Sequence, residues 1–226
     1  MTHPARSRVA QQFAACAAVA ALAIPTAACA PKSPDFQSIL TTTSTTSVAP
    51  TTTEKPEPIW SYLASVGVAG KQVEPSELTD LSVSLPTPPG WSTYTNENIT
   101  PETAMISKGD DYPTAMLMVF MLRGEFDIAE AIKHGNADAQ LSKNFNQLDA
   151  STADFNGFPS AMVEGSYDLA GKRLHSFNRI VIATSAPPAN QRYLIQLTVT
   201  SLATEAYSQS DDIEAIIAGF SVSANH

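Results

Sequence analysis

An apolar stretch in the middle of the chain runs from Ala115 to Leu122 and reads AMLMVFML. It is apolar at both odd and even positions, and Pro113 and Gly124 bound it, so it is too short for a buried helix. A strand that is apolar on both faces must be covered on both faces. The stretch therefore predicts the centre of a sheet that lies between helices or loops.

Alternating or β-rich segments predict further strands around this one. These lie at 81–85, 160–169, 172–182 and 192–202. The pair Pro89-Gly90 suits the centre of a type II turn after the first of them. Ala170-Gly171 predicts a tight hairpin between the second and the third, which makes these two strands antiparallel.

Four helices are predicted from apolar spacing and from capping residues. The first carries Ile59, Leu63 and Val66 on one face and ends at Gly67. A capping box of Asp127 and Glu130 opens the second, which ends at Gly135. Two more follow, one from Asn136 through Phe145 and one capped by Ser210 with Ile213, Ile216, Ile217 and Phe220 on one face and Gly219 near its end. Helices and an antiparallel meander together indicate an α+β domain over residues 59–226.

The N-terminus has the pattern of a bacterial lipoprotein signal. Arg6 and Arg8 precede an apolar, alanine-rich run, and the small residues Thr26-Ala27-Ala28 stand directly before Cys29. This order predicts a diacylglyceryl thioether on Cys29 and cleavage before it, with residues 1–28 as the signal peptide. The lipid would hold the protein on the extracytoplasmic face of the plasma membrane.

Two other interpretations of this segment remain open. Thr26 stands where an aliphatic residue is usual, and the run from Val9 to Ala28 has the length of an uncleaved membrane anchor. A cleaved and soluble product is the other possibility. Residues 29–58 include TTTSTTSVAPTTT, a stretch without charge or core-forming residues, and we interpret them as a tether.

Charge and cysteine content narrow the possible partners. Cleavage removes two arginines and no acid, so 11 basic and 22 acidic side chains remain. That balance argues against nucleic acid as a partner and against attraction to anionic lipid heads. Cys16 lies in the signal, and acylation uses Cys29, so no thiol remains for a disulfide, a metal or nucleophilic catalysis.

The predicted hairpin brings chemically capable side chains to one face. With the turn at Ala170-Gly171, Asp168 pairs with Arg173, Ser166 with His175, Glu164 with Phe177 and Met162 with Arg179. The gathered residues are Glu164, Asp168, Arg173, His175, Phe177 and Arg179. They are candidates to bind a sugar, an anionic head group or a protein partner. The alternative, which we favour from sequence, is a solvated face with cross-strand charge pairs.

No motif indicates a cofactor, a phosphate loop or a serine nucleophile elbow. His134 and Asp138 have metal-ligand spacing, but Gly135-Asn136 separates them and no further histidine lies nearby, so we expect no metal site. Trp91 and Tyr94 are expected in core or loop packing rather than in a pocket. The methionines of 115–122 are likewise expected in the core rather than in a lipid slot.

Several long segments resemble the LpqN/LpqT family of mycobacterial lipoproteins. They are PKSPDFQSIL, LTDLSVSLPTPPGW, IKHGNADAQ, FNGFPSAMVEGSYD and QSDDIEAIIAGF, between Pro31 and Phe220. The resemblance implies a PsbP-like α/β/α sandwich with a central, mostly antiparallel sheet. It also implies a role in handling envelope lipid (trehalose mycolate) or in protein contacts, and it carries over no catalytic residues.

We therefore expect a monomeric, non-enzymatic binding or accessory protein anchored to the membrane, without a cofactor. Its partner would be an envelope lipid or a membrane protein. The alternative is an envelope hydrolase that acts on a glycolipid or glycan with Glu164 or Asp168 and His175.

Overall fold

The computed structural model describes residues 55–225, so the predicted signal peptide, Cys29 and most of the predicted tether lie outside the described residues. The helices in chain order are α1 (Ile59–Ser65), the 3-10 turn η1 (Pro75–Glu77), α2 (Ile128–Lys133), α3 (Ala137–Gln140) and α4 (Ser210–Gly219). The strands are β1 (Ala69–Val73), β2 (Leu81–Ser84), β3 (Ser92–Thr93), β4 (Ala104–Ser107), β5 (Thr114–Arg123), β6 (Asn146–Ser151), β7 (Ser160–Leu169), β8 (Lys172–Thr184), β9 (Arg192–Leu202) and β10 (Ser221–Ala224).

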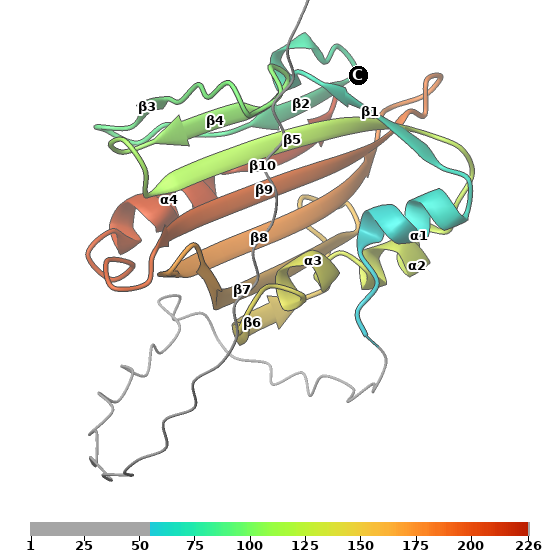
Figure 1. Cartoon of the computed structure of the whole chain (residues 1–226). Coiled ribbons are helices and arrows are strands. Elements are labelled where there is room, and N and C mark those ends of the chain that lie inside the picture. Colours follow the sequence, from blue (N-terminus) through green and yellow to red (C-terminus); the bar gives the residue numbers. More distant parts are fainter. Residues whose placement is uncertain (1–54, 226) are drawn as a thin grey trace, which may run out of the picture. The chain divides into compact units, whose positions relative to one another are not determined.

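One large antiparallel sheet dominates the fold (Figure 1). It has eight strands in the order β3-β4-β5-β9-β8-β7-β6, and β1 also pairs with β5, beyond the end of β4. A separate two-stranded ribbon is formed by β2 and β10. Within residues 55–225, no helix has the length and apolar character that a membrane crossing requires.

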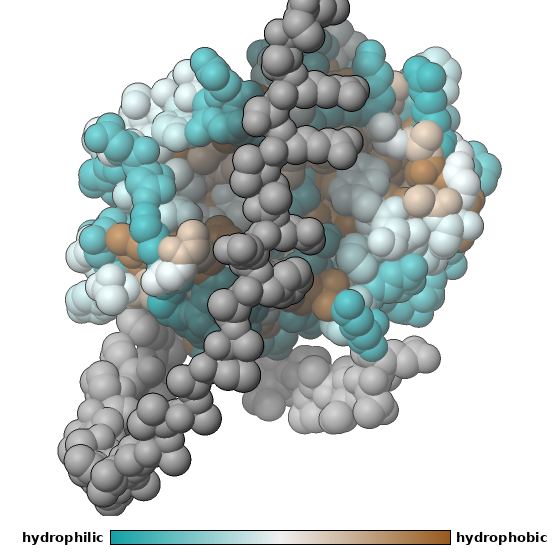
Figure 2. Space-filling model, in the orientation of Figure 1, coloured by the Kyte–Doolittle hydropathy of each residue, from teal (hydrophilic) through white to brown (hydrophobic). Residues whose placement is uncertain are grey.

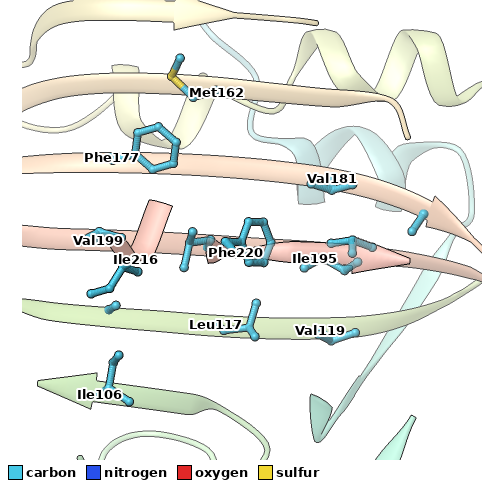
Figure 3. Packing of buried hydrophobic residues seen from close by; sticks show 14 of the residues in the cluster. Ile106, Leu117, Val119, Met162, Phe177, Val181, Ile195, Val199, Ile216 and Phe220 are labelled. Carbon is cyan, nitrogen blue, oxygen red and sulfur yellow. The ribbon is translucent and has the colours of Figure 1, made fainter. Parts of the chain in front are cut away.

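The sheet lies between two layers, which confirms the α+β sandwich. On the back, α4 and the β2–β10 ribbon cover a cluster to which Leu117, Phe177, Leu197 and Ile216 belong (Figure 3). On the front, α1, α2 and α3 lie against the β7 side and one end of the sheet (Figure 1). Their smaller cluster contains Ile59, Leu63, Ala131, Ile182 and Leu194.

Strand β5 is central, as its two-sided apolar pattern predicts. Ala115, Leu117 and Val119 point to the back cluster and are at most 1% exposed. Phe120 and Leu122 point to the front cluster. Met116 and Met118, which precede them on the front, are only half-buried and belong to neither cluster, so the cover expected on both faces is complete on the back and partial on the front.

The predicted hairpin between β7 and β8 is confirmed in every pair. Asp168 lies opposite Arg173, Ser166 opposite His175, Glu164 opposite Phe177 and Met162 opposite Arg179. Both turn residues have positive φ, 48° at Ala170 and 78° at Gly171, as a type I′ turn requires. The Pro89-Gly90 turn is also present: the Trp91 amide donates to the Pro88 carbonyl, and Gly90 has φ 82°.

The helix predictions are correct in place but wrong in some details. The helix expected from Asn136 to Phe145 is the single turn α3, and the Asn136 amide donates to the Met162 carbonyl on β7 instead of capping it. Ser210 is the first residue of α4 and not its cap. The N-cap position is held by Gln209, whose side chain makes no capping hydrogen bond. Val66 lies beyond α1 and is 43% exposed. By contrast, Asp127 accepts a hydrogen bond from the Glu130 amide, as predicted for α2.

Candidate functional site

The front face of the sheet is only partly covered by helices (Figure 1). Five half-buried residues form its uncovered part, which we name the open face: Met116 and Met118 on β5, Gln196 and Thr198 on β9, and Asn178 on β8. The register pairs Met116 with Thr198, Met118 with Gln196 and Thr198 with Asn178, so their side chains lie on one side. Methionines therefore border a strip of amides and hydroxyls.

The open face carries no charge. Along β5, β8 and β9 the register places charged residues on the front only at the two ends, Lys172 and Arg192. Each is paired with an acid, Lys172 with Asp111 and Arg192 with Glu125. Figure 2 views this side, where hydrophobic and hydrophilic residues are both visible at the surface.

The polar groups of the open face retain unused hydrogen-bonding capacity. Thr198 Oγ1 donates to Asn178 Oδ1 over 3.0 Å, and Asn178 Nδ2 donates to Ser176 Oγ over 3.1 Å. The second Nδ2 hydrogen of Asn178 has no partner within the part of the chain that the structure describes. Gln196 makes no side-chain hydrogen bond to any residue between 55 and 225, so its amide is available to a ligand.

Aromatic rings stand at the borders of the open face, and two glycines make room for them. Trp60 of α1 packs on Gly70, where an added Cβ would meet the ring at 2.8 Å, and it contacts Phe120 edge-on with centroids 4.7 Å apart. Phe145 packs on Gly165 of β7, where an added Cβ would lie 2.5 Å from the ring. Neither glycine has positive φ, so the close approach of a ring explains both.

Two tyrosines lie toward the β7–β8 hairpin end. Burial raises the pKa of Tyr167, and the nearby Tyr112 raises it further. Burial also raises the pKa of Tyr112, with Asp111 adding to the effect and Lys172 opposing it. Since a free tyrosine titrates near about pH 10, both phenols are protonated and neutral under physiological conditions.

The back face holds the residues that the hairpin was predicted to gather. Glu164 and His175 are 2% and 7% exposed, and Glu164 Oε1 lies 2.8 Å from His175 Nε2. Phe177 is equally buried, at 2%. The interpretation of these three as part of a solvated face is therefore wrong. Helix α4 lies over them, and nothing in the strand pattern could indicate which face α4 would cover.

A small hollow remains between this pair and α4. Its lining comes from the sheet residues Glu164, His175 and Phe177 and from Ser210, Ile213, Glu214 and Ile217 of α4. The internal volume is about 10 Å³, which is room for about one water molecule. Glu164 Oε2 is buried here without a hydrogen-bond partner among the described residues.

The other three predicted residues separate into two environments. Arg173 donates to Asp168 Oδ1 over 3.1 Å and to Ser166 Oγ over 2.7 Å, near the hairpin turn. Hydrogen bonds from Asn144 and then from Arg173 lower the pKa of Asp168. Arg179 lies instead between two rings, with Cζ 4.5 Å from the Phe155 centroid and 5.5 Å from the Phe177 centroid. The six residues thus share a face but do not form one site.

Trp91 and His134, which were also singled out in the sequence, each contact another side chain of the fold. Trp91 is 6% exposed in the back cluster, and its Nε1 donates to Asp212 Oδ2 over 3.1 Å. The ring of His134 stacks on Tyr62, with centroids 4.6 Å apart. Among residues 55–225, no group of three or more His, Cys, Asp or Glu side chains is placed to hold a metal ion. Sequence reasoning missed the open face, although the uncharged even positions of 174–182 and 194–202 are a signal for it.

The family model described as "Probable lipoprotein LpqN" matches residues 55–223 of the chain. The chain belongs to this lipoprotein family. The LpqT lipoprotein of Mycobacterium tuberculosis is 67% identical over 212 residues, which cover 94% of each protein. Its counterpart in Mycobacterium leprae is 61% identical over 206 residues, which cover 91% of this chain and 94% of that protein. The resemblance inferred from sequence segments is thereby confirmed.

A solved structure has the same fold. It is the crystal structure of LpqN, which is described as involved in cell envelope biogenesis of Mycobacterium tuberculosis. The TM-score is 0.64 and the identity 19%, over 75% of this chain and 99% of that one. At this identity the likeness concerns the antiparallel sheet and its layers, and it does not transfer a ligand.

Proposed function

We propose that this protein is a lipid-anchored, non-enzymatic binding module of the cell envelope that holds an uncharged amphiphile on its open face. The observation that carries the proposal is the strip of neutral amides and hydroxyls beside methionines, bordered by aromatic rings. A charged ligand would find no counterion there. A neutral head group with hydroxyls can exchange its water for Asn178, Gln196 and Thr198 at little electrostatic cost.

Each part of the open face suits one part of such a ligand. The methionine side chains of Met116 and Met118 are flexible and polarizable, and they accommodate an alkyl chain. The amides bind hydroxyl groups, and the ring of Trp60 or Phe145 offers a flat surface to a sugar. Trehalose mycolates, which the family resemblance suggests, belong to this chemical class.

The anchor is part of the same proposal. Residues 1–28 would be removed as a signal, Cys29 would carry the diacylglyceryl group, and residues 29–58 would tether the domain outside the plasma membrane. Membership of a lipoprotein family supports this. Intact-mass analysis of the native protein is expected to give a chain that begins at Cys29 with an added diacylglyceryl mass. A free thiol or a retained leader would refute the anchor.

Trp60 provides a direct test of ligand binding, because it lies at the border of the open face while Trp91 is buried in the back cluster. We expect n-octyl glucoside, below its micelle concentration, to change the Trp60 fluorescence of the mature chain with a saturable dependence. Thr198→Asp, which puts a charge on the open face, should weaken binding tenfold or more. Thr204→Asp, on an exposed turn, is the matched control and should bind like wild type.

Two results would count against the binding proposal. One is an unsaturable response in the wild type, which would mean nonspecific partition of the glycoside. The other is equal affinity in the Thr198→Asp and Thr204→Asp proteins, which would put the ligand elsewhere.

The Glu164–His175 contact favours a second candidate, an envelope hydrolase in which Glu164 orients His175. The small hollow and the cover of α4 make this the weaker candidate. Asp168 gives it no support, since Arg173 and Asn144 already bind that carboxylate. The test compares wild type with His175→Ala on chromogenic esters and glycosides. A hundredfold lower rate in the variant would favour the hydrolase, and equal background rates would remove it.

A further inference from the structure

Arg179 differs from the other two arginines of the β7–β8–β9 region in its partners. Arg173 is bound by Asp168, and Arg192 lies 3.3 Å from Glu125. Among residues 55–225, no carboxylate lies within 4.0 Å of the Arg179 guanidinium. This is unexpected in a chain with 22 acidic and 13 basic side chains, where an acid is available for most cations.

The Arg179 guanidinium is nevertheless partly shielded from solvent. It is half-buried on the back of β8, and burial lowers its pKa. Phe155 and Phe177 both lie within about 6 Å, the range of a cation–π contact. Phe155 is itself held by Phe220, whose ring stacks on it with centroids 5.1 Å apart.

The rings engage the guanidinium but leave its N–H groups largely unused. A guanidinium has five N–H donors in a planar fork. Among residues 55–225, these donors make one side-chain hydrogen bond, from Nη1 to Ser160 Oγ at 3.4 Å, which is long for a charged donor. A desolvated cation with free donors is costly unless an acceptor completes it.

We propose that Arg179 is the anchor of an oxyanion site on the back of the sheet that takes the phosphate or carboxylate head group of an anionic amphiphile. The fork binds two oxygens of such a group in one plane. The half-buried rings of Phe155 and Phe158, beside the buried Met162, give the attached carbon chain an apolar surface. This site is independent of the open face, because it lies on the opposite side of the sheet and recognises the opposite kind of head group.

The test is an NMR titration of the Arg179 Nε–Hε signal in the mature chain. Dihexanoyl phosphatidic acid is the probe, with inorganic phosphate and acetate as free anions and dihexanoyl phosphatidylcholine as the zwitterionic control. We expect saturable shifts with phosphatidic acid at an affinity at least tenfold above that of inorganic phosphate. Phosphatidylcholine should cause little change.

Variants separate the site from general electrostatics. Arg179→Gln should weaken phosphatidic acid binding at least tenfold, and Arg179→Lys should fall between, since lysine keeps the charge but loses the fork. Arg123→Gln removes an exposed arginine at the end of β5 and should bind like wild type. Thr198→Asp, which tests the open face, should leave this binding unchanged, and Arg179→Gln should leave n-octyl glucoside binding unchanged.

Three outcomes would overturn the inference. They are an unmoved Nε–Hε signal in the wild type with every anion, equal affinity for inorganic phosphate and phosphatidic acid, and undiminished binding in Arg179→Gln. The first measurement needs no variant, so it decides the matter even if Arg179→Gln does not fold.

Discussion

Glu164 of β7 and His175 of β8 are diagonal neighbours across the hairpin, and Oε1 and Nε2 lie 2.8 Å apart beneath α4. In the strand register the two residues are not directly opposite each other: Glu164 lies opposite Phe177, and His175 lies opposite Ser166. The contact is made because a diagonal neighbour on the same face is still within reach of a long side chain. It joins two polar groups that are almost completely buried.

This pair should behave as a unit in stability measurements. Removing one partner, as in Glu164→Leu or His175→Leu, leaves the other polar group buried alone and should lower the free energy of unfolding by about 3 kcal/mol. The double Leu variant should lose clearly less than the sum of the two single losses. Urea unfolding at pH 7 measures the unfolding free energy of all four proteins of the cycle. The control is Asp168→Asn, which removes the carboxylate of the partly exposed Asp168–Arg173 pair and should change the unfolding free energy by less than about 1 kcal/mol. Strictly additive losses would contradict the coupling.

The β7–β8 turn should be open to stabilisation. Ala170 has φ 48°, a region that is unfavourable for alanine by about 1–2 kcal/mol. Asparagine tolerates this conformation, and Asn-Gly is a preferred pair for a type I′ turn. Ala170→Asn should therefore raise the unfolding free energy by about 0.5–1 kcal/mol, measured as a higher urea midpoint at an unchanged m-value. Gly171→Ala, with φ 78° at that position, should have the opposite effect.

The contact of Trp60 with Gly70 should be sensitive to one methyl group. An added Cβ at residue 70 lies 2.8 Å from two atoms of the indole ring, so Gly70→Ala must displace it. We expect a loss of about 1–3 kcal/mol from this overpacking, together with altered near-ultraviolet circular dichroism. Adding Trp60→Leu, which frees the space, should recover part of that loss. A Gly70→Ala protein as stable as wild type would show that the ring moves without strain.

The Tyr193 hydroxyl should lose its proton at a higher pH than the hydroxyl of a free tyrosine. Burial first, and then the hydrogen bond that its hydroxyl donates to Asp80 Oδ1 over 2.9 Å, raise the pKa of Tyr193 to about 12. Because the folded-state pKa is above the unfolded value of about 10, this group stabilises the fold fully below about pH 10. The contribution is lost as the pH rises toward about 12. Absorbance at 295 nm, compared with Tyr193→Phe, reports this step, and Asp80→Asn should move it to lower pH.

Asp212 should contribute at the acid end of the pH range. A hydrogen bond from Lys108, followed by one from Trp91, lowers the pKa of this carboxyl. Its stabilising effect is therefore present above about pH 3.9 and lost as the pH falls through the lower folded-state value. The Lys108→Met protein should lose less stability than wild type between pH 5 and pH 3. The difference should stay below about 1 kcal/mol, since Lys108 is about half exposed. Parallel stability curves would contradict this role.

Much of the sheet was predictable because its signals are local. The two-sided apolar run of β5, the Ala170-Gly171 turn and the resulting register of β7 and β8 all follow from residues close together in the chain. The short strands β1, β4, β6 and β10 were not predicted, because each is only four to six residues long. Strands β1 and β10 also pair with residues far away in sequence, Gly70 with Leu122 and Val222 with Val83. The helix expected from Asn136 through Phe145 ends at Gln140, and Asn144, with φ 53°, has a backbone conformation that a helix cannot continue through.

For the candidate sites too, some features follow from local sequence and others depend on tertiary packing. The lipoprotein signal stays a prediction from sequence. Sequence alone determined the family, the buried strand β5 and which side chains share each face of the hairpin, since strand alternation has a period of two whatever surrounds it. Only the tertiary structure decided that α4 buries Glu164 and His175, that Arg179 lies between two phenylalanines, and that an uncharged part of the front face remains open. Which surface stays accessible depends on where the covering layers pack, and that is settled by contacts between segments that no local pattern connects.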